Sequence, residues 1–269
     1  MTLFAEKLKN TKNGALQFMN NNFNISFLGQ CVQNFISAMK YTFGGNVALK
    51  SVVTQAARIG FDSLGISLMI VFIAASVIAL QVSNQFLMSG ADTYIGGFLA
   101  VALIREIAPG FAALAIGARA GTAITAQIAN MKVTSQVDAM KVLHVNPIGY
   151  YFAPRILAGA FSVMCVVVLA EFVGILGGML VSYFSVGLHP NRYFNSVWLM
   201  LNTKDIYISI FKGFLFGAII STVCATVGYN TTGGAKNVGE STTKSAIYCT
   251  IYLLLADLLV AFLFYASNH

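Results

Sequence analysis

Charged side chains stand inside the long apolar stretches of this sequence, where charges are rare. Arg105 and Glu106 are neighbours in one apolar run, and Glu171 and Asp257 lie in two others. A charge placed in the middle of a membrane helix costs about 2.5–3.5 kcal/mol on insertion scales, so it faces a partner, water or a polar path. Two roles are therefore open: structural pairing between helices, for example of Arg105 with Glu171 or Asp257, or direct contact with something that crosses the membrane.

The motifs of common catalytic and metal sites are missing from the sequence. It contains no GxxxxGK[ST], HExxH or GxSxG, and the nearest phosphate-loop candidate, GGAKNVGEST, has the wrong order, so we do not expect this chain to bind ATP. His144, His189 and His269 fall in separate loops or the tail, and the four cysteines are scattered without a CxxC pair. We expect no catalytic residue, no metal and no cofactor, and interpret the chain as non-enzymatic.

The composition is that of a membrane protein. Of the 269 residues, 57% are hydrophobic and 9% charged, with a mean hydropathy of +0.76, whereas soluble domains carry about 25% charged residues. A spanning helix needs about 20 apolar residues, and the runs are too long and lack the alternation of a β-barrel. We predict an all-α integral membrane protein with five spanning helices, near residues 63–82, 95–118, 156–184, 207–229 and 246–266.

Two regions follow from these spans: an N-terminal segment, 1–62, and a five-helix domain, 63–269. Apolar residues in 30–62 recur at helical spacing with Lys and Arg between them, which favours an amphipathic helix in the membrane interface. A soluble helix packed on a partner is the alternative. The first 20 residues lack the features of a cleaved signal peptide, so we expect the first spanning helix to act as the targeting signal.

The basic residues predict the orientation of the chain. Alternate segments outside the spans hold 12 and 2 Lys or Arg residues, and the richer side is cytoplasmic by the positive-inside rule. The N-terminus and segment 119–155 are then cytoplasmic, and the C-terminus is outside. The net charge of +7 is accounted for by this topology, so we expect no nucleic-acid partner.

The polar stretch 130–155 connects the second and third spans. Ser135-x-x-Asp138 is typical of a capping box, and Asn146-Pro147 predicts a stop because a residue before proline avoids the helical region. An apolar stripe at helical spacing is formed by Val133, Val137 and Met140. We predict a short amphipathic helix on the cytoplasmic side, which either rests on lipid head groups or is gripped by another protein.

The segment from Arg105 to Arg155, REIAPGFAALAIGARAGTAITAQIANMKVTSQVDAMKVLHVNPIGYYFAPR, resembles the signature region of the MlaE/YrbE family, the permeases of Mla-type ABC lipid transporters. The similar pieces are Arg105-Glu106, Pro109, Gly117-x-Arg119-x-Gly121, Met131-Lys132-Val133-Thr134, Gln136, Asp138-Ala139, Pro147 and Pro154-Arg155. A second block, 211–246, resembles the family's C-terminal region. The chain departs from the family pattern at Gln127, where Glu is usual, and at Asn146, where Asp is usual.

The resemblance implies a function and a set of partners. It implies a permease subunit of the inner membrane that moves phospholipids between that membrane and the cell envelope and so maintains outer-membrane lipid asymmetry. Hydrolysis of ATP would be carried out by partner chains. The implied partners are a second copy of the chain, a cytoplasmic ABC ATPase dimer, an MCE-domain protein outside and a small STAS-type cytoplasmic subunit.

The resemblance also assigns roles to residues. From their positions in apolar runs, Glu171 and Asp257 are interpreted as structural intramembrane charges. The resemblance favours Arg105 and Glu106 for the substrate path, where a kink at Pro109 would suit the wall of a cavity. It makes 130–155 a coupling segment that docks on the ATPases, through Lys132, Thr134, Gln136, Asp138, Met140 and Lys141. The competing interpretation is a secondary transporter or channel that works without an ATPase, although five helices make an inverted repeat hard to build. A third is a scaffold of a membrane complex.

Overall fold

The computed structural model describes residues 25–45 and 47–266, and the interpretations made above for the first 20 residues and for His269 lie outside them. Throughout the described part the chain is helical, and no β-strand occurs there. The elements are α2 (Ile25–Phe43), α3 (Leu49–Ala56), η1 (Ala57–Phe61), α4 (Asp62–Met88), η2 (Asp92–Tyr94), α5 (Ile95–Ala102), η3 (Leu103–Ile107), α6 (Ala108–Ile116), η4 (Gly117–Gly121), α7 (Thr122–Val133), α8 (Gln136–Val142), α9 (Pro147–Val186), α10 (Pro190–Met200), α11 (Thr203–Tyr229) and α12 (Ala235–Ala266).

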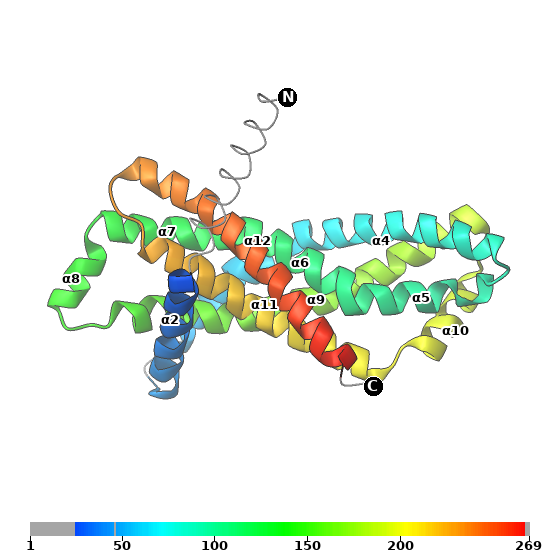
Figure 1. Ribbon diagram of the computed structural model, residues 1–269, viewed down its shortest axis with the longest axis horizontal. Helices are drawn as coiled ribbons and strands as arrows, with labels where there is room; N and C mark the ends of the chain where they lie inside the picture. Colours follow the sequence, from blue (N-terminus) through cyan, green and yellow to red (C-terminus); the bar gives the residue numbers. More distant parts are fainter. Residues whose placement is uncertain (1–24, 46, 267–269) are drawn as a thin grey trace, which may run out of the picture.

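Five helical rods in the described residues are long and apolar enough to cross a membrane, which confirms the predicted fold class. They run over Leu49–Met88, Asp92–Val133, Pro147–Val186, Thr203–Tyr229 and Ala235–Phe264. The first three contain 40, 42 and 40 residues, about 60 Å of helix at 1.5 Å per residue. Because a bilayer core is about 30 Å thick, these rods extend well beyond it, and Figure 1 shows α8 at one end of the long axis and α10 at the other.

The predicted N-terminal amphipathic segment is divided between two elements. Helix α2 packs against α9 and α11, whereas α3 runs through η1 into α4 without a break and packs on α9. Phe35 from α2 and Val52 and Ala56 from α3 contact the core, while Val32 and Ile36 are exposed on the outer face of α2. The segment is therefore anchored on its own chain, and a position in the membrane interface stays a prediction.

Small residues let α9 and α11 approach at backbone distance. A Cβ on Gly217 would overlap the carbonyl oxygen of Gly159, and one on Gly213 would lie 3.0 Å from the Met164 Cα atom. Gly213 and Gly217 form a GxxxG motif, and two further GxxxG motifs also pack within the chain. Gly117 and Gly121 lie against Cys249 and Cys224, and Gly174 and Gly178 lie against Leu103 and Tyr193. Each of these motifs thus has an intramolecular contact that accounts for it, as expected of small-residue membrane packing.

Three π-helical turns interrupt the α-helical rods. They are η1, η3 and η4, and each contains an arginine: Arg58, Arg105 and Arg119 respectively. A π turn inserts one residue into the helical ladder and occurs preferentially at functional sites. The inserted residue changes the rotation of the helix at that point. It therefore sets the direction in which each arginine side chain leaves a rod whose other residues are mostly apolar.

Candidate functional site

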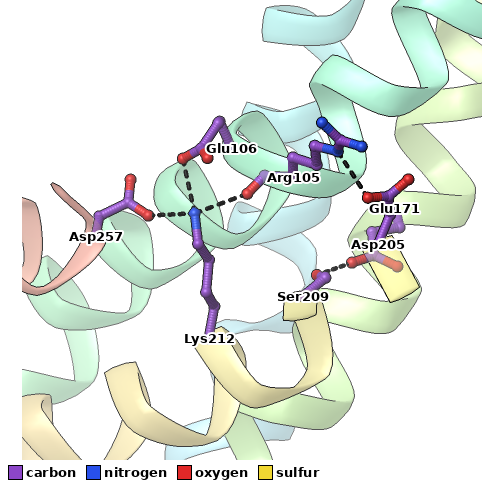
Figure 2. Close-up of polar contacts among 7 residues, drawn as sticks. All are labelled: Arg105, Glu106, Glu171, Asp205, Ser209, Lys212 and Asp257. Atoms are coloured by element: carbon purple, nitrogen blue, oxygen red, sulfur yellow. Dashed lines mark hydrogen bonds and ion pairs between the residues drawn. The ribbon is translucent and has the colours of Figure 1, made fainter. Parts of the chain in front are cut away.

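A cluster of charged and polar side chains lies between the membrane rods (Figure 2). It contains two cations, four carboxyl groups and one hydroxyl, on α9, α11, α12 and the π turn η3: Arg105, Glu106, Glu171, Asp205, Ser209, Lys212 and Asp257. We call this set the charged cluster. It unites residues that are up to 152 positions apart in the sequence, and its centre is one lysine.

Lys212 is buried, with 1% of its side chain exposed. Its ammonium group lies 2.7 Å from Glu106 Oε2, 2.6 Å from Asp257 Oδ1 and 2.8 Å from the carbonyl oxygen of Arg105. The ammonium group donates hydrogen bonds to Glu106 and to the Arg105 carbonyl, and it forms an ion pair with Asp257. Lys212 therefore joins η3, α11 and α12 through one buried charge. Removing one partner of a buried ion pair strongly destabilises the folded protein, because the other charge is left uncompensated.

Pro109 explains why the Arg105 carbonyl is available. Proline has no N–H, so it cannot donate to the carbonyl four residues before it, which is that of Arg105. Lys212 Nζ donates to this oxygen instead, at 2.8 Å. Pro109 itself is buried and sits in the first turn of α6, directly after the π turn η3. A carbonyl freed in this way inside a membrane helix needs water or a side chain as its donor, and here the lysine side chain is that donor.

Arg105 binds a second carboxylate on α11. Its Nε atom donates to Asp205 Oδ1 at 2.7 Å, and the Asp205 side chain is 3% exposed. The other carboxylate oxygen accepts from the backbone N–H of Asn202 at 3.2 Å, and the Asn202 side chain completes a capping box. The same Asp205 carboxylate therefore caps the first turn of α11 and binds Arg105. The position of the α11 start is linked in this way to the position of Arg105.

Glu171 occupies a separate place in the cluster. It is buried on α9 and accepts a hydrogen bond from the hydroxyl of Ser209 on α11. Structural pairing between helices occurs, but not in the two combinations given as examples, because Arg105 binds Asp205 and Asp257 binds Lys212. Glu171 does join two helices, as a structural intramembrane charge would, but its partner is a neutral hydroxyl.

The cluster is closed on one side and open on the other. Lys212 and Asp205 are buried, whereas the side chains of Glu106, Arg105 and Asp257 are 42%, 30% and 21% exposed. Glu106 thus keeps nearly half of its surface free while it binds Lys212. Since a carboxylate at this depth needs a polar neighbour, the exposed half is the part of the cluster that another molecule can reach.

Asp205, Ser209 and Lys212 are the cluster members that were not assigned a site role from the sequence. Lys212 is a lysine within the predicted span 207–229, a signal as strong as that of Glu171. Asp205 lies two residues before that span, so it was counted as part of a loop. The structure shows instead that α11 begins at Thr203 and carries Asp205 in its first turn.

The helix α8 forms a second candidate site, at the end of the molecule (Figure 1). Lys132 and Lys141 both bind Asp138, at 3.0 and 3.5 Å, and Val137 is buried. The hydrogen bond from Lys132 holds the pKa of the Asp138 carboxyl below its usual range. These charges therefore brace the junction between α7 and α8.

The capping box predicted at Ser135 is wrong. Ser135 adopts a left-handed conformation, φ 59°, and its side chain makes no cap hydrogen bond. His144, just beyond the end of α8, is also left-handed at φ 58°. Non-glycine residues adopt this conformation at a cost, and such strain often marks functional segments. Asn146 starts the next helix, since its Oδ1 accepts from the N–H groups of Ile148 and Gly149.

Apolar residues at the end of α8 were missed by the sequence interpretation. Val142 and Leu143 are 77% and 73% exposed. Of the other predicted coupling residues, Gln136 is exposed, Met140 packs against the core, and the Thr134 hydroxyl donates to the Asn130 carbonyl at 2.8 Å. Two adjacent exposed apolar side chains at the end of a projecting helix can contact a partner or lipid, and the dipeptide Val142-Leu143 was the signal available in the sequence.

Five membrane rods, a buried charge cluster between them and a projecting helical connection are the features of a multi-pass α-helical membrane protein. The model of the family described as Permease MlaE matches residues 52–263. A probable ABC transporter permease protein of Synechocystis is 34% identical over 224 residues, which are 83% of this chain and 85% of that one. One from Rickettsia prowazekii is 34% identical over 217 residues, 81% and 84% of the two chains.

A plant protein is also similar. The chloroplastic protein TRIGALACTOSYLDIACYLGLYCEROL 1 of Arabidopsis thaliana is 31% identical over 221 residues, 82% of this chain and 63% of that one. With a family match over most of its length, the chain belongs to the MlaE family of ABC transporter permeases.

Proposed function

We propose that the chain is the non-catalytic membrane subunit of an ABC transporter that moves phospholipids between the inner membrane and the cell envelope. In this proposal a separate ATPase dimer supplies the energy, and the permease works as a dimer with an MCE-domain protein outside and a small STAS-type subunit inside. Family membership supports the transport role. The name of the Arabidopsis relative is that of a diacylglycerol lipid, which supports a lipid cargo.

The observation that carries the proposal is the half-exposed carboxylate of Glu106 beside buried Lys212. A carboxylate in a membrane rod needs water, a partner or a lipid head group on its free side. A second copy of the chain placed over this side would enclose a space lined by charges from both copies. Arg105, also partly exposed, would meet a phosphate there, while the buried members hold it in position.

Helix α8 is proposed to transmit the ATPase cycle. Asp138 and Lys141 of α8 and Lys132 at the end of α7 form ion pairs centred on Asp138, so they stiffen the connection to the second rod rather than bind a partner directly. The exposed Val142 and Leu143 are then the residues that enter an apolar groove on the ATPase. The second rod, Asp92–Val133, carries both the α8 junction and η3, so movement at α8 reaches the cluster through one continuous helix.

Photo-crosslinking at position 110 tests the substrate path. Gly110 lies one helical turn after Glu106, and a side chain there would meet only the Asp257 carboxylate, at 3.9 Å. A photoreactive residue at 110 keeps all cluster charges in place. The matched control is Ile73, which is 52% exposed in an apolar groove. We expect phospholipid adducts at both positions, with only the signal at 110 changing when ATP is trapped on the complex. An ATP-insensitive signal at 110 would leave the cluster a structural role alone.

The competing secondary transporter is tested by isolation of the native complex. The proposal requires an ABC ATPase to remain with the chain in mild detergent and Leu143→Asp to release it. A chain that is isolated alone, and that carries a flux driven by a proton gradient in vesicles, would favour the competing function instead.

A further inference from the structure

A polar pocket of about 270 Å³ opens between η1 and η4. Two of the three arginine-bearing π turns line it, and they come from different membrane rods. Its polar lining consists of Gln55, Arg58, Asp62, Arg119 and Gln127. Arg119 lies 14 positions after Arg105, about 20 Å along a helix, so this pocket is distinct from the charged cluster.

The arginines of the pocket are poorly compensated. Arg119 donates to the Ser63 hydroxyl at 3.0 Å but lies 3.9 Å from its one carboxylate, Asp62, at the limit of an ion pair. Within the described residues, Arg58 has no hydrogen-bond or ion-pair partner. Asp62 is thus a single and distant counter-charge for two guanidinium groups.

A third guanidinium lies behind the pocket wall. Arg155 is 5% exposed, and it donates to the Tyr151 carbonyl at 2.8 Å and to Gln127 Oε1 at 3.3 Å. Its Nε atom is buried without a partner, and no carboxylate in the described part of the chain pairs with it. Arg58 and Arg155 are close enough to repel one another. A buried charge that binds only neutral groups is costly, so the chain alone leaves this region short of negative charge.

The pocket lies near the ends of two apolar runs, where lipid head groups are expected. Asp62 comes directly before the apolar run 63–82 and Arg58 lies one helical turn earlier, whereas Arg119 directly follows the run 95–118 and Gln127 lies nine residues beyond its end. These are the ends of the two apolar runs nearest α7 and α8. Charged lipid groups occupy such a boundary, and guanidinium groups bind phosphate oxygens with paired N–H donors.

We propose that this pocket binds the phosphate of an anionic lipid head group, held by Arg58 and Arg119 and by the charge of Arg155 behind Gln127. The three guanidinium groups and Asp62 give the empty site a charge of +2 if all are ionised. The bound phosphate supplies the counter-charge that the chain lacks and ties the first rod to the second at η1 and η4. The site is separate from the transport path and does not depend on which lipid is moved.

Lipid titration monitored by native mass spectrometry tests the site on the full-length chain in detergent. The probes are phosphatidylglycerol, phosphatidic acid, phosphatidylcholine and inorganic phosphate. We expect the anionic lipids to bind the wild type preferentially and the double variant Arg58→Gln/Arg119→Gln to bind them at least about tenfold more weakly, as loss of charge-assisted hydrogen bonds implies. The matched control, Lys236→Gln/Lys244→Gln, removes the same charge from exposed positions of α12 and should bind like the wild type.

A second variant tests the missing counter-charge without removing a cation. Gln127→Glu places a carboxylate against Arg155, so it should raise the melting temperature of the lipid-free protein and weaken anionic-lipid binding several-fold. The proposal would be overturned if the lysine control lost as much affinity for anionic lipid as the double arginine variant. It would also be overturned if the double arginine variant and Gln127→Glu both bound anionic lipid as tightly as the wild type. Inorganic phosphate that binds as tightly as the lipids would support the anion chemistry and refute the lipid as its source.

Discussion

Replacement of Lys212 by methionine separates the structural from the transport role of the charged cluster. Methionine fills a similar volume but leaves Glu106 and Asp257 without their shared cation. Breaking a buried ion pair costs about 3–5 kcal/mol, and because Glu106 is 42% exposed and Asp257 21%, we take the lower end, about 3 kcal/mol. At about 2–4 °C per kcal/mol for a chain of this size, the melting temperature should fall by about 6–12 °C.

The assay is thermal unfolding in detergent with a matched control and a mutant cycle. Lys204→Met removes an exposed lysine from the first turn of the same helix and should change stability by less than about 0.5 kcal/mol. In the cycle, Lys212→Met and Asp257→Asn should be non-additive by about 1–3 kcal/mol, as groups in contact are. A coupling energy below about 0.5 kcal/mol would refute the reasoning, since it would mean that the ion pair does not hold α11 to α12.

The neutral triple variant, Lys212→Met with Glu106→Gln and Asp257→Asn, then distinguishes the two roles. Removing all three charges together leaves none of them unpaired, so much of the lost stability should return. A cluster that only joins helices predicts that transport returns with stability. A cluster on the substrate path predicts a stable protein that no longer moves lipid, and this is the result that the proposed function requires.

Further predictions concern the helix contacts, α8 and the topology. Gly217→Ala should cost about 1–3 kcal/mol by overpacking, whereas Gly65→Ala, which meets nothing within 4 Å, should not destabilise; equal melting temperatures would contradict this. Because the pKa of Asp138 is lowered, its ion pairs should persist above its ordinary value of 3.8 and be lost as pH falls through the lowered pKa. Amide-exchange protection of α8 should fall with them, and an Asp138→Asn variant that matches the wild type at neutral pH would exclude this role. Leu143→Asp should weaken ATPase retention at least about tenfold without a change in melting temperature. In a cysteine-free background, Gly90→Cys should be labelled from outside intact spheroplasts; labelling only after permeabilisation would reverse the orientation.

The fold was predictable because membrane insertion imposes one dominant constraint. Backbone polar groups must be satisfied within each helix, so runs such as 63–82 and 156–184 identify spanning helices without any long-range information. The helix ends were less predictable. The first rod begins at Leu49 and the third at Pro147, because the polar turns beyond the apolar run are stabilised by packing on other rods, which hydropathy does not report.

Four of the seven members of the charged cluster were singled out from the sequence, but their pairing was not predictable. An ionisable residue within an apolar run is visible in the sequence, as Glu106 and Asp257 show, yet its partner depends on rotation of the rod. The π turn η3 and Pro109 set that rotation for Arg105, and neither the extra residue of a π turn nor the depth at which α11 begins follows from periodicity. The two example pairings of Arg105 therefore do not occur, even though the residues themselves were correctly singled out.

The π turns also indicate how this permease can combine rigidity with movement. Rods about 60 Å long transmit displacement well, and the glycine contacts between α9 and α11 hold the core of the bundle together. The second rod, in contrast, contains two π turns, η3 and η4, separated by α6 with Pro109 in its first turn. π turns occur preferentially at functional sites, and these two lie on the one rod that joins α8 to the charged cluster. In the proposed coupling, displacement of α8 would rotate η4 and η3 against the pair α9 and α11. Lys212 is anchored on α11, so Glu106 on η3 would move away from it and their ion pair would break.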